Sequence, residues 1–395
     1  MLGLSSLARQ IQPSATLAAG AKARQLKAQG LKVFDFSLGQ PDFPTPEHIC
    51  HAAVKAMKQG HTGYTPANGI PELRAAIARL YQTAYGISYT PEQVVVSNGA
   101  KHSIYNVLAA LVGPGDEVII PSPYWVSYSD MVEMTGAKYV LVQTAAENQF
   151  KMTPSQLKAA LTPRTRLLMI NSPCNPTGTV YTRRELEAIA DVVLDASLSV
   201  LSDEIYERLI YGDSWPTCFA TLRPELKDRT ITVSGASKTY SMTGWRMGWA
   251  CGPVPAIKAM GDIQSQQTGC PCSVSQYAAL AALEGEQECV EKMRWEFEER
   301  RDLVCRRLNS ITGITCSVPQ GAFYAFFNVA KLFGRMLGGK SITNSADFCQ
   351  AALEQAHVNL VPGSAFGTEG FVRLSYAASL DQLNGGLDQL EKWLL

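Results

Sequence analysis

The stretch Ile231-Thr-Val-Ser-Gly-Ala-Ser-Lys-Thr-Tyr-Ser-Met-Thr-Gly-Trp-Arg246 is the most informative part of this chain. From Thr230 to Trp245 it carries a single charged side chain, Lys238. An isolated ammonium among apolar and small residues is costly unless it is paired or loses its proton. A neutral lysine can attack a carbonyl and form a Schiff base, so the stretch indicates a strand followed by a reactive lysine. The alternative is a surface lysine on a loop after a strand.

The composition excludes several classes of protein. The 395 residues are 46% apolar and 18% charged with zero net charge, and the length suggests two or three domains, or one large and one small domain. A neutral chain has no overall field that would recruit nucleic acid or an anionic membrane. No apolar run reaches ~18 residues, and the N-terminus lacks a signal-peptide pattern. We therefore expect a cytoplasmic protein that binds neither nucleic acid nor membrane.

The cysteines and histidines do not form a metal-binding pattern. Ten cysteines are scattered from Cys50 to Cys349 and are typical of reduced thiols. Cys270 and Cys272 are too close in sequence to form a metal pair, and no second pair or histidine cluster accompanies them. Cys174 is interpreted as a small packing residue. We expect no metal site.

Short strand-like runs alternate with helical runs in the middle of the chain. The candidate strands are residues 93–97, 117–121, 139–143, 166–171, 199–202 and 230–234. A capping box from Thr182 to Glu185 begins a helix between two of them. The pattern predicts an α/β fold with a mostly parallel, helix-covered sheet in a large domain over 45–290. Residues 1–44 and 291–395 are predicted to form a smaller α+β part.

Ligands of open α/β sheets bind beyond the carboxyl ends of strands, and four polar clusters follow strand-like runs here. The first is the turn Gly99-Ala-Lys101 before a helix, whose free N–H groups suit a phosphate. The second is the stiff loop Asn175-Pro-Thr-Gly178, whose asparagine amide could donate to a phenolate-like oxygen. Taken alone, the first is also compatible with an ordinary strand-to-helix turn, and the second with a solvated asparagine on a rigid turn.

The third and fourth clusters supply a carboxylate, a phenol and two cations. Asp203 ends a strand-like run three residues before Tyr206, so the two could contact a pyridinium nitrogen and a ring oxygen. The alternative is a helix-capping aspartate beside a core tyrosine. Ser237 and Lys238 precede Arg246, whose planar guanidinium suits a phosphate. Together, the four clusters form the set that pyridoxal phosphate requires.

A fifth candidate lies in the predicted small domain. In Phe371-Val-Arg-Leu-Ser-Tyr376, strand alternation places Arg373 on the face opposite Val372 and Leu374. An inward-facing arginine could bind a carboxylate through two hydrogen bonds. The alternative is that Arg373 is an exposed arginine on an edge strand, without a role in binding.

Over essentially its whole length the chain resembles the class I/II aminotransferases, fold type I pyridoxal phosphate enzymes of the aspartate aminotransferase superfamily. Its most specific match is the lysine-site motif over 235–248, and the motifs over 175–178 and 202–206 lie at the family's usual spacing. The resemblance implies that Lys238 binds the cofactor as a Schiff base and that Asp203 pairs with the ring nitrogen.

The resemblance also implies roles for the remaining site residues. It places Asn175 and Tyr206 at the ring oxygen, Trp125 in a stack on the ring, and Tyr64 at the phosphate of the partner subunit in the family's homodimer. Substrate binding is assigned to Arg373 at the α-carboxylate and Gly39 above it, with Trp125 and Asn175 nearby. The phosphate contacts are assigned to Gly99, Ala100, Lys101, Ser237 and Arg246.

Within the family, the likeness is closest to bacterial aspartate aminotransferases that begin with Pro13-Ser-Ala-Thr16 and carry a lysine in the turn before the helix. By resemblance to that subgroup, Lys101, helped by Ser14 or Thr16, binds the distal carboxylate of the substrate. The stretch 262–268 lacks the arginine that another subgroup uses. The expected reaction is ping-pong transfer between aspartate and 2-oxoglutarate. Prephenate, aromatic, kynurenine or alanine substrates, or a lyase activity, are the alternatives.

Two other classes of protein fit the sequence less well. A transcription regulator that uses this fold as a sensor needs a basic DNA-binding domain before it, but only about 40 residues precede the first large-domain helix, without a helix-turn-helix pattern. A NAD enzyme needs a Gly-x-Gly-x-x-Gly turn after a strand, and the sequence has none.

Overall fold

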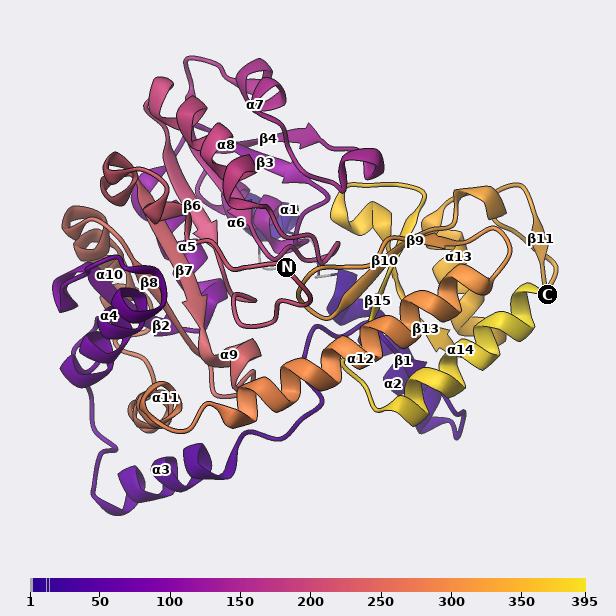
Figure 1. Cartoon of the computed structure of the whole chain (residues 1–395), viewed down its shortest axis with the longest axis horizontal. Helices are drawn as coiled ribbons and strands as arrows, with labels where there is room; N and C mark the ends of the chain where they lie inside the picture. The colour runs from indigo at the N-terminus through magenta and orange to yellow at the C-terminus, as the bar shows by residue number, and fades with distance from the viewer. Residues whose placement is uncertain (1–2, 12, 14) are drawn as a thin grey trace.

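The computed structural model describes residues 3–395 with the exception of residues 12 and 14. Its larger part is built on a seven-stranded sheet with the order β2-β8-β7-β6-β5-β3-β4 (Figure 1). Six strands are parallel, and β8 runs antiparallel to its neighbours β2 and β7. The predicted α/β fold is confirmed. The strands are β2 (Val94–Asn98), β3 (Glu117–Ser122), β4 (Lys138–Gln143), β5 (Thr165–Asn171), β6 (Ser199–Asp203), β7 (Thr230–Gly235) and β8 (Met247–Cys251).

Helices cover both faces of this sheet. One face carries α5 (Ala100–Leu111), α6 (Ser127–Met134) and α10 (Val254–Gln267). The opposite face carries α3 (Glu47–Lys58), α4 (Pro71–Tyr85), α7 (Pro154–Ala160), α8 (Arg183–Asp195) and α11 (Ser273–Glu284). In α8, the buried residues Leu186, Ile189 and Val193 recur at helical spacing and form the stripe that packs on the sheet.

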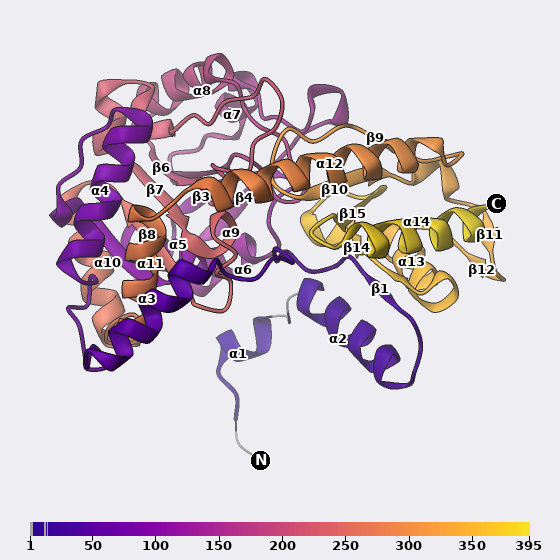
Figure 2. The same cartoon turned by 60° about the horizontal axis from the view of Figure 1, so that its bottom comes forward.

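The smaller part is built on an antiparallel sheet with the order β14-β15-β10-β9. Its strands are β9 (Thr315–Cys316), β10 (Tyr324–Asn328), β14 (Val361–Pro362) and β15 (Phe371–Ser375), with α13 (Ser345–Ala351) and α14 (Leu380–Leu394) beside them. The N-terminal segment joins this part, because β1 (Phe34–Asp35) pairs in parallel with β13 (Val358–Asn359). In Figure 2, α2 (Ala15–Ala28) lies beside the same elements, whereas α1 (Ser6–Gln10) lies apart from them. A hairpin of β11 (Met336–Leu337) and β12 (Lys340–Ser341) completes the smaller part.

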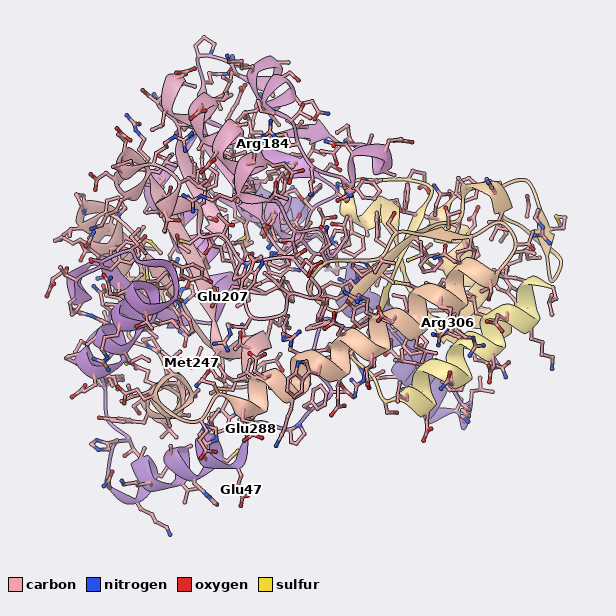
Figure 3. All side chains as sticks on the ribbon, in the orientation of Figure 1. Glu47, Arg184, Glu207, Met247, Glu288 and Arg306 are labelled. Atoms are coloured by element: carbon pink, nitrogen blue, oxygen red, sulfur yellow. The ribbon has the colours of Figure 1, made fainter. Side chains whose placement is uncertain are left out.

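One long helix, α12 (Glu288–Ser310), links the two parts. Glu288 and Arg306 are labelled near its two ends in Figure 3. Arg300 of α12 is almost completely buried and pairs with Asp42 at 2.6 Å, which ties the helix to the N-terminal segment. The boundaries at residues 44/45 and 290/291 stay a prediction. In the described part of the chain, no helix has the length and hydropathy to cross a membrane.

The six predicted strands agree with the structure to within one residue at each end. The seventh strand, β8, was not predicted. Its five residues are all buried, and such a short apolar run cannot be told from a buried helical segment by periodicity. Its direction reverses because only the four-residue helix α9 (Ala236–Thr239) and a tight loop separate it from β7. This arrangement places Lys238 at the carboxyl end of β7.

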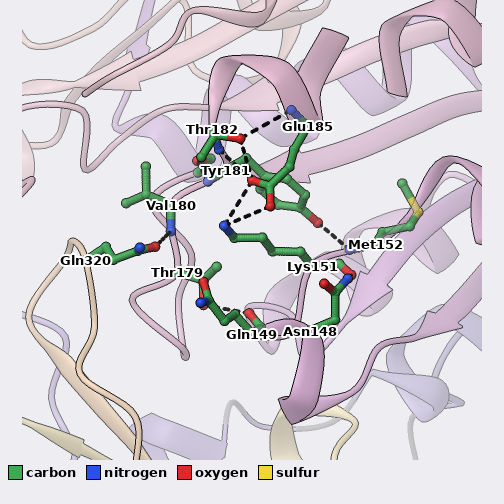
Figure 4. Close-up of polar contacts among 11 residues, drawn as sticks. Asn148, Gln149, Lys151, Met152, Thr179, Val180, Tyr181, Thr182, Glu185 and Gln320 are labelled. Carbon is green, nitrogen blue, oxygen red and sulfur yellow. Dashed lines mark hydrogen bonds and ion pairs between the residues drawn. The ribbon is translucent and has the colours of Figure 1, made fainter. Parts of the chain in front are cut away.

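The predicted capping box at the start of α8 is present and has additional partners (Figure 4). The Thr182 N–H donates to Glu185 Oε2 at 2.7 Å, and the nearly buried Lys151 ammonium pairs with the same oxygen at 2.9 Å. The Val180 N–H donates to Gln320 Oε1 of the smaller part at 3.3 Å. These contacts hold in place the segment that follows the loop of Asn175.

Candidate active site

A cavity of about 520 Å³ lies at the carboxyl ends of the large-sheet strands and is bordered by β10 and β15 of the small sheet. It brings together residues that are far apart in the sequence. The sequence-predicted residues that line it are Gly39, Ala100, Lys101, Trp125, Asn175, Asp203, Tyr206, Ser237, Lys238, Arg246 and Arg373.

Lys238 is half-buried in α9, directly after β7. Its ammonium donates a hydrogen bond to the Gly39 carbonyl oxygen at 2.5 Å. Desolvation, followed by the positive charges of Arg246 and Arg373, lowers the pKa of Lys238 to about 8. An amine with this pKa is partly neutral near pH 7–8 and can act as a nucleophile or a base. The surface-lysine alternative does not match this position.

Asp203 is buried at the end of β6. Its Oδ1 accepts the Ile205 N–H at 3.2 Å, and its Oδ2 accepts the Tyr128 hydroxyl at 2.6 Å. Burial raises the pKa of Asp203 to about 6, while these hydrogen bonds and Lys238 oppose the rise. Asp203 is therefore mainly a carboxylate at neutral pH, and it can balance a positively charged ring nitrogen.

Arg373 is buried in β15, which lies between β14 and β10. The alternative of an exposed edge-strand arginine is wrong, because this strand is internal to the sheet. Its Nη1 donates to Asn175 Oδ1 at 2.9 Å and its Nη2 donates to the Ser37 carbonyl at 2.5 Å, while the buried Nε has no partner. An uncompensated buried donor fits an anionic ligand. Because the Asn175 carbonyl oxygen is engaged by Arg373, its NH₂ group is left to donate into the cavity.

The N-terminus of α5 and Arg246 form an anion-binding corner. Gly99 has a φ of +87°, a left-handed conformation that favours glycine because other residues rarely adopt it, and Arg246 Nη2 lies close to where a side chain would begin. The first turn of α5 leaves backbone N–H groups without helical partners, and the helix dipole adds positive potential. Arg246 and Ser237 border the same space. This set of donors suits a phosphate group.

Three residues that the sequence reasoning did not assign also belong to the site. The Tyr324 hydroxyl lies 2.7 Å from the Tyr206 hydroxyl. Asn171 donates to the Asp203 carbonyl at 2.9 Å and accepts the Asn175 N–H at 2.8 Å, so it connects two of the predicted residues. The third is Tyr128. Its hydroxyl contacts Asp203, 75 residues away along the chain, so local sequence patterns do not reveal it. No local sequence signal identifies Tyr324.

Some residues considered from the sequence lie outside the cavity lining or outside the described residues. Tyr64 is 98% exposed and does not line the cavity of its own chain. Ser14 lies outside the described residues, and the side chain of Thr16 is likewise not described. Cys174 lies beside Asn175, outside the cavity lining, and burial raises the pKa of its thiol, which matches the interpretation as a packing residue. Within the described residues, no three His, Cys, Asp or Glu side chains gather in a way that could hold a metal ion.

Two further carboxylates, Glu204 and Glu207, are buried close to Asp203 in the interior (Figure 3 labels Glu207). Burial, reinforced by the neighbouring carboxylates, raises the pKa of Glu207 from its ordinary 4.5 to about 8. The folded protein thus keeps a proton that the unfolded chain releases near pH 4.5. The free energy of unfolding therefore falls as the pH rises from about 4.5 to 8, by up to ~1.4 kcal/mol per pH unit for one group.

We expect Glu207→Gln to flatten this pH dependence, because glutamine has no proton to release. Relative to the wild type, the variant should gain roughly 1–3 kcal/mol in unfolding free energy between pH 5 and pH 8. Denaturant unfolding of the holoenzyme at a series of pH values measures the gain. The exposed Glu147→Gln serves as the control, and an unchanged pH slope in Glu207→Gln would contradict the assignment.

The donor set of the cavity fits pyridoxal phosphate. An anion-binding corner, a carboxylate and a lysine of lowered pKa border one space, together with a phenol and an amide that can reach a ring oxygen. On a mostly parallel, helix-covered sheet, this arrangement defines the class of fold type I pyridoxal phosphate enzymes.

Comparisons with known proteins agree with this class. The aminotransferase class I and II family matches residues 32–388. The aspartate aminotransferase of Geobacillus stearothermophilus is 48% identical over 391 residues, 99% of this chain and 98% of that protein. The aspartate/prephenate aminotransferase of Cereibacter sphaeroides is 48% identical over 381 residues, 96% and 95% of the two chains.

Solved structures show the same similarity. The aspartate aminotransferase from Rhizobium meliloti superposes with a TM-score of 0.97 at 43% identity, covering 100% of this chain and 99% of that one. The aspartate aminotransferase from Thermus thermophilus with maleate gives a TM-score of 0.94 at 40% identity, with both chains fully covered. The chain belongs to the aminotransferase class I and II family. It is an aminotransferase that uses pyridoxal phosphate and acts on amino acids and 2-oxo acids.

Proposed function

We propose that this enzyme transfers the amino group between aspartate and 2-oxoglutarate in a ping-pong reaction. The observation that carries the proposal is the presence of two separate cations, Arg373 and Lys101, in the lining of one cavity. A dicarboxylic substrate needs one cation for each carboxylate. The relatives named as aspartate aminotransferases and the neighbour crystallised with maleate, a dicarboxylate, support this choice.

Lys101 is placed to select the substrate. It lies in the first turn of α5, remains exposed to solvent, and holds its ammonium 4.9 Å from the centre of the Trp125 ring. Desolvation and then the charge of Arg246 lower the pKa of Lys101. An anionic substrate group would relieve both effects, because it replaces lost hydration and balances two like charges. Lys101 is therefore proposed to bind the distal carboxylate.

The remaining residues position and move a proton. Pyridoxal phosphate, when bound, supplies an electron-accepting ring that acidifies the proton on the substrate Cα. Lys238 Nζ, with its lowered pKa, takes this proton as a general base and later gives it up as a general acid. Asp203 stays ionised opposite the ring nitrogen, while Arg373 fixes the substrate α-carboxylate. Asn175 and Tyr206 are proposed to donate to the ring oxygen, and Trp125 to cover the ring.

The phosphate of the cofactor is proposed to occupy the anion-binding corner. Its donors would be the N–H groups of Ala100 and Lys101 with the side chains of Ser237 and Arg246. The Gly99 N–H instead donates to the Ser97 carbonyl at 2.7 Å, so Gly99 contributes through its backbone conformation. Gly39 is proposed to close over the substrate, because its carbonyl already contacts Lys238. Without a side chain, Gly39 also leaves room for the Tyr324 hydroxyl, which would lie 2.5 Å from a Cβ atom.

We also propose a cytoplasmic homodimer in which Tyr64 reaches the phosphate of the partner subunit. The almost complete exposure of Tyr64, and its absence from the cavity of its own chain, support a role across an interface.

Prephenate is the second candidate substrate. It is favoured by the 48% identity to the aspartate/prephenate aminotransferase of Cereibacter sphaeroides. Prephenate carries a second carboxylate, so the same two cations would serve it. Measuring both acceptors with one preparation separates the two activities.

The test is the specificity of wild-type protein and of Lys101→Met over aspartate, glutamate, alanine, phenylalanine and kynurenine. We expect aspartate to be preferred by the wild type. In Lys101→Met, kcat/KM for aspartate should fall about 10- to 100-fold, since a hydrogen bond to a charged group is lost, whereas kcat/KM for alanine should change less than about threefold. Lys158→Met, on an exposed position of α7, is the control. Equal losses with both substrates would refute the role of Lys101.

A further inference from the structure

Tyr128 connects two residues at the site without being assigned a role of its own. It lies in α6, is 3% exposed, and its hydroxyl donates to Asp203 Oδ2 at 2.6 Å. Its ring meets the Trp125 ring edge to face, with 5.4 Å between the centroids and 90° between the planes. Two residues proposed to contact the cofactor ring are therefore held by one side chain.

The Tyr128 hydroxyl is the side-chain donor to the Asp203 carboxylate. Among the described side chains, no other group hydrogen-bonds to an Asp203 carboxylate oxygen, and the remaining partner is the Ile205 N–H. The other titratable groups that face Asp203 are Lys238, Tyr206, Cys174, Glu204 and Glu207. Of these, only Lys238 is positively charged.

The direction of this hydrogen bond is fixed over the working pH range. Burial and the neighbouring Asp203 charge raise the pKa of Tyr128 well above its ordinary value, so the phenol stays protonated and donates. In return, the hydrogen bond lowers the pKa of Asp203 against the effect of burial. It also fixes the rotation of the carboxylate, because each oxygen has its own donor and one lone pair of each remains free.

We propose that Tyr128 is a positioning residue that orients the Asp203 carboxylate and keeps it ionised for pairing with the protonated ring nitrogen of the cofactor. The inference rests on the proposed role of Asp203. It adds a residue that acts through the carboxylate that pairs with the ring nitrogen. Tyr128→Phe removes the hydroxyl alone and keeps the ring contact with Trp125.

The experiment is a double-mutant cycle of Tyr128→Phe and Asp203→Asn, with Tyr124→Phe as the matched control. The Tyr124 hydroxyl lies 3.4 Å from Ser129 Oγ and makes no contact with Asp203. For each holoenzyme, the dissociation constant of pyridoxal phosphate is measured by equilibrium dialysis between pH 5 and pH 9. The visible absorbance of the bound cofactor is followed over the same range.

In the wild-type background, we expect Tyr128→Phe to weaken cofactor binding about tenfold near pH 7 and to move the acid midpoint of binding up by about one pH unit. In the Asp203→Asn background, the same change should alter binding less than about threefold, because the acceptor of the hydrogen bond is gone. Tyr124→Phe should leave both the affinity and the midpoint unchanged.

The possible failures point to different conclusions. An equal effect of Tyr128→Phe in both backgrounds means that it acts through packing on Trp125, and the proposal is overturned. An unshifted midpoint and affinity overturn it as well. If Asp203→Asn alone binds the cofactor normally over the whole pH range, the role of Asp203 fails, and the role of Tyr128 fails with it.

Discussion

Replacing Lys238 with alanine should abolish transamination, lowering kcat by at least about 10⁴-fold. Among the described residues, Lys101 is the other lysine that lines the cavity, and it stands at the first turn of α5 rather than after β7, so it is not placed to take over. Steady-state turnover with aspartate and 2-oxoglutarate measures the loss. Lys238→Arg should be equally inactive, since guanidinium keeps the charge but neither attacks carbonyls nor gives up its proton near neutral pH.

A chemical readout accompanies the kinetic one. Borohydride reduction of the wild-type holoenzyme should fix the cofactor covalently to Lys238, and peptide mass analysis locates the modified residue. Lys158→Ala, a change of an exposed lysine, should leave both the reduction and the turnover intact. Labelling of a different lysine, or measurable turnover in Lys238→Ala, would show that the assignment is wrong.

Arg373→Lys should lower kcat/KM for every amino acid substrate by roughly 10²- to 10³-fold. Lysine keeps the positive charge but lacks the planar guanidinium group. It therefore loses the unpartnered Nε and the hydrogen bonds to Asn175 and the Ser37 carbonyl. Because all substrates carry an α-carboxylate, the loss should be similar for aspartate and alanine. This pattern distinguishes Arg373 from Lys101, whose loss should affect only the dicarboxylic substrate.

The matched control is Arg166→Lys, since Arg166 has a 65% exposed side chain that pairs with Asp116 on the surface. It should change kcat/KM less than about twofold. If Arg373→Lys spares alanine while aspartate suffers, Arg373 binds the distal carboxylate instead, and its role has to be exchanged with that of Lys101.

Local sequence patterns were sufficient for six of the seven strands of the large sheet and for the residues that line the cavity at their carboxyl ends. Strand-like runs that end in polar residues fix which side chains reach the carboxyl edge, so the sequence alone places Asp203 and Lys238 together. Arg373 could not be decided in this way. Its burial depends on β14 and β10 pairing on either side of β15, and these pairings join residues distant in sequence.

The unpredicted parts have the same cause. β8 reads as a short apolar run, and its place between β2 and β7 is set by long-range pairing. Tyr324 reaches Tyr206 from a strand of the other sheet, a distance of 118 residues along the chain. The role proposed for Tyr64 lies outside the cavity of its own chain, so no pattern within one chain tests it. The residue types at the ends of strands could therefore be predicted from the sequence, whereas contacts between the two parts of the molecule could not.

The helix α12 runs from the end next to α11 to the small sheet, so a tilt of this helix would displace the small sheet relative to the large one. Its 23 residues span about 35 Å, so a tilt of about 1° around one end displaces the other end by about 0.6 Å. The far end packs on β9 and β10, next to the strand that carries Arg373. A tilt of one or two degrees at the α11 end would therefore move the guanidinium of Arg373 by about an ångström relative to Lys238 in α9. Such a shift would change the 2.9 Å distance between Arg373 Nη1 and Asn175 Oδ1, since Arg373 lies in the small sheet and Asn175 follows β5 of the large sheet.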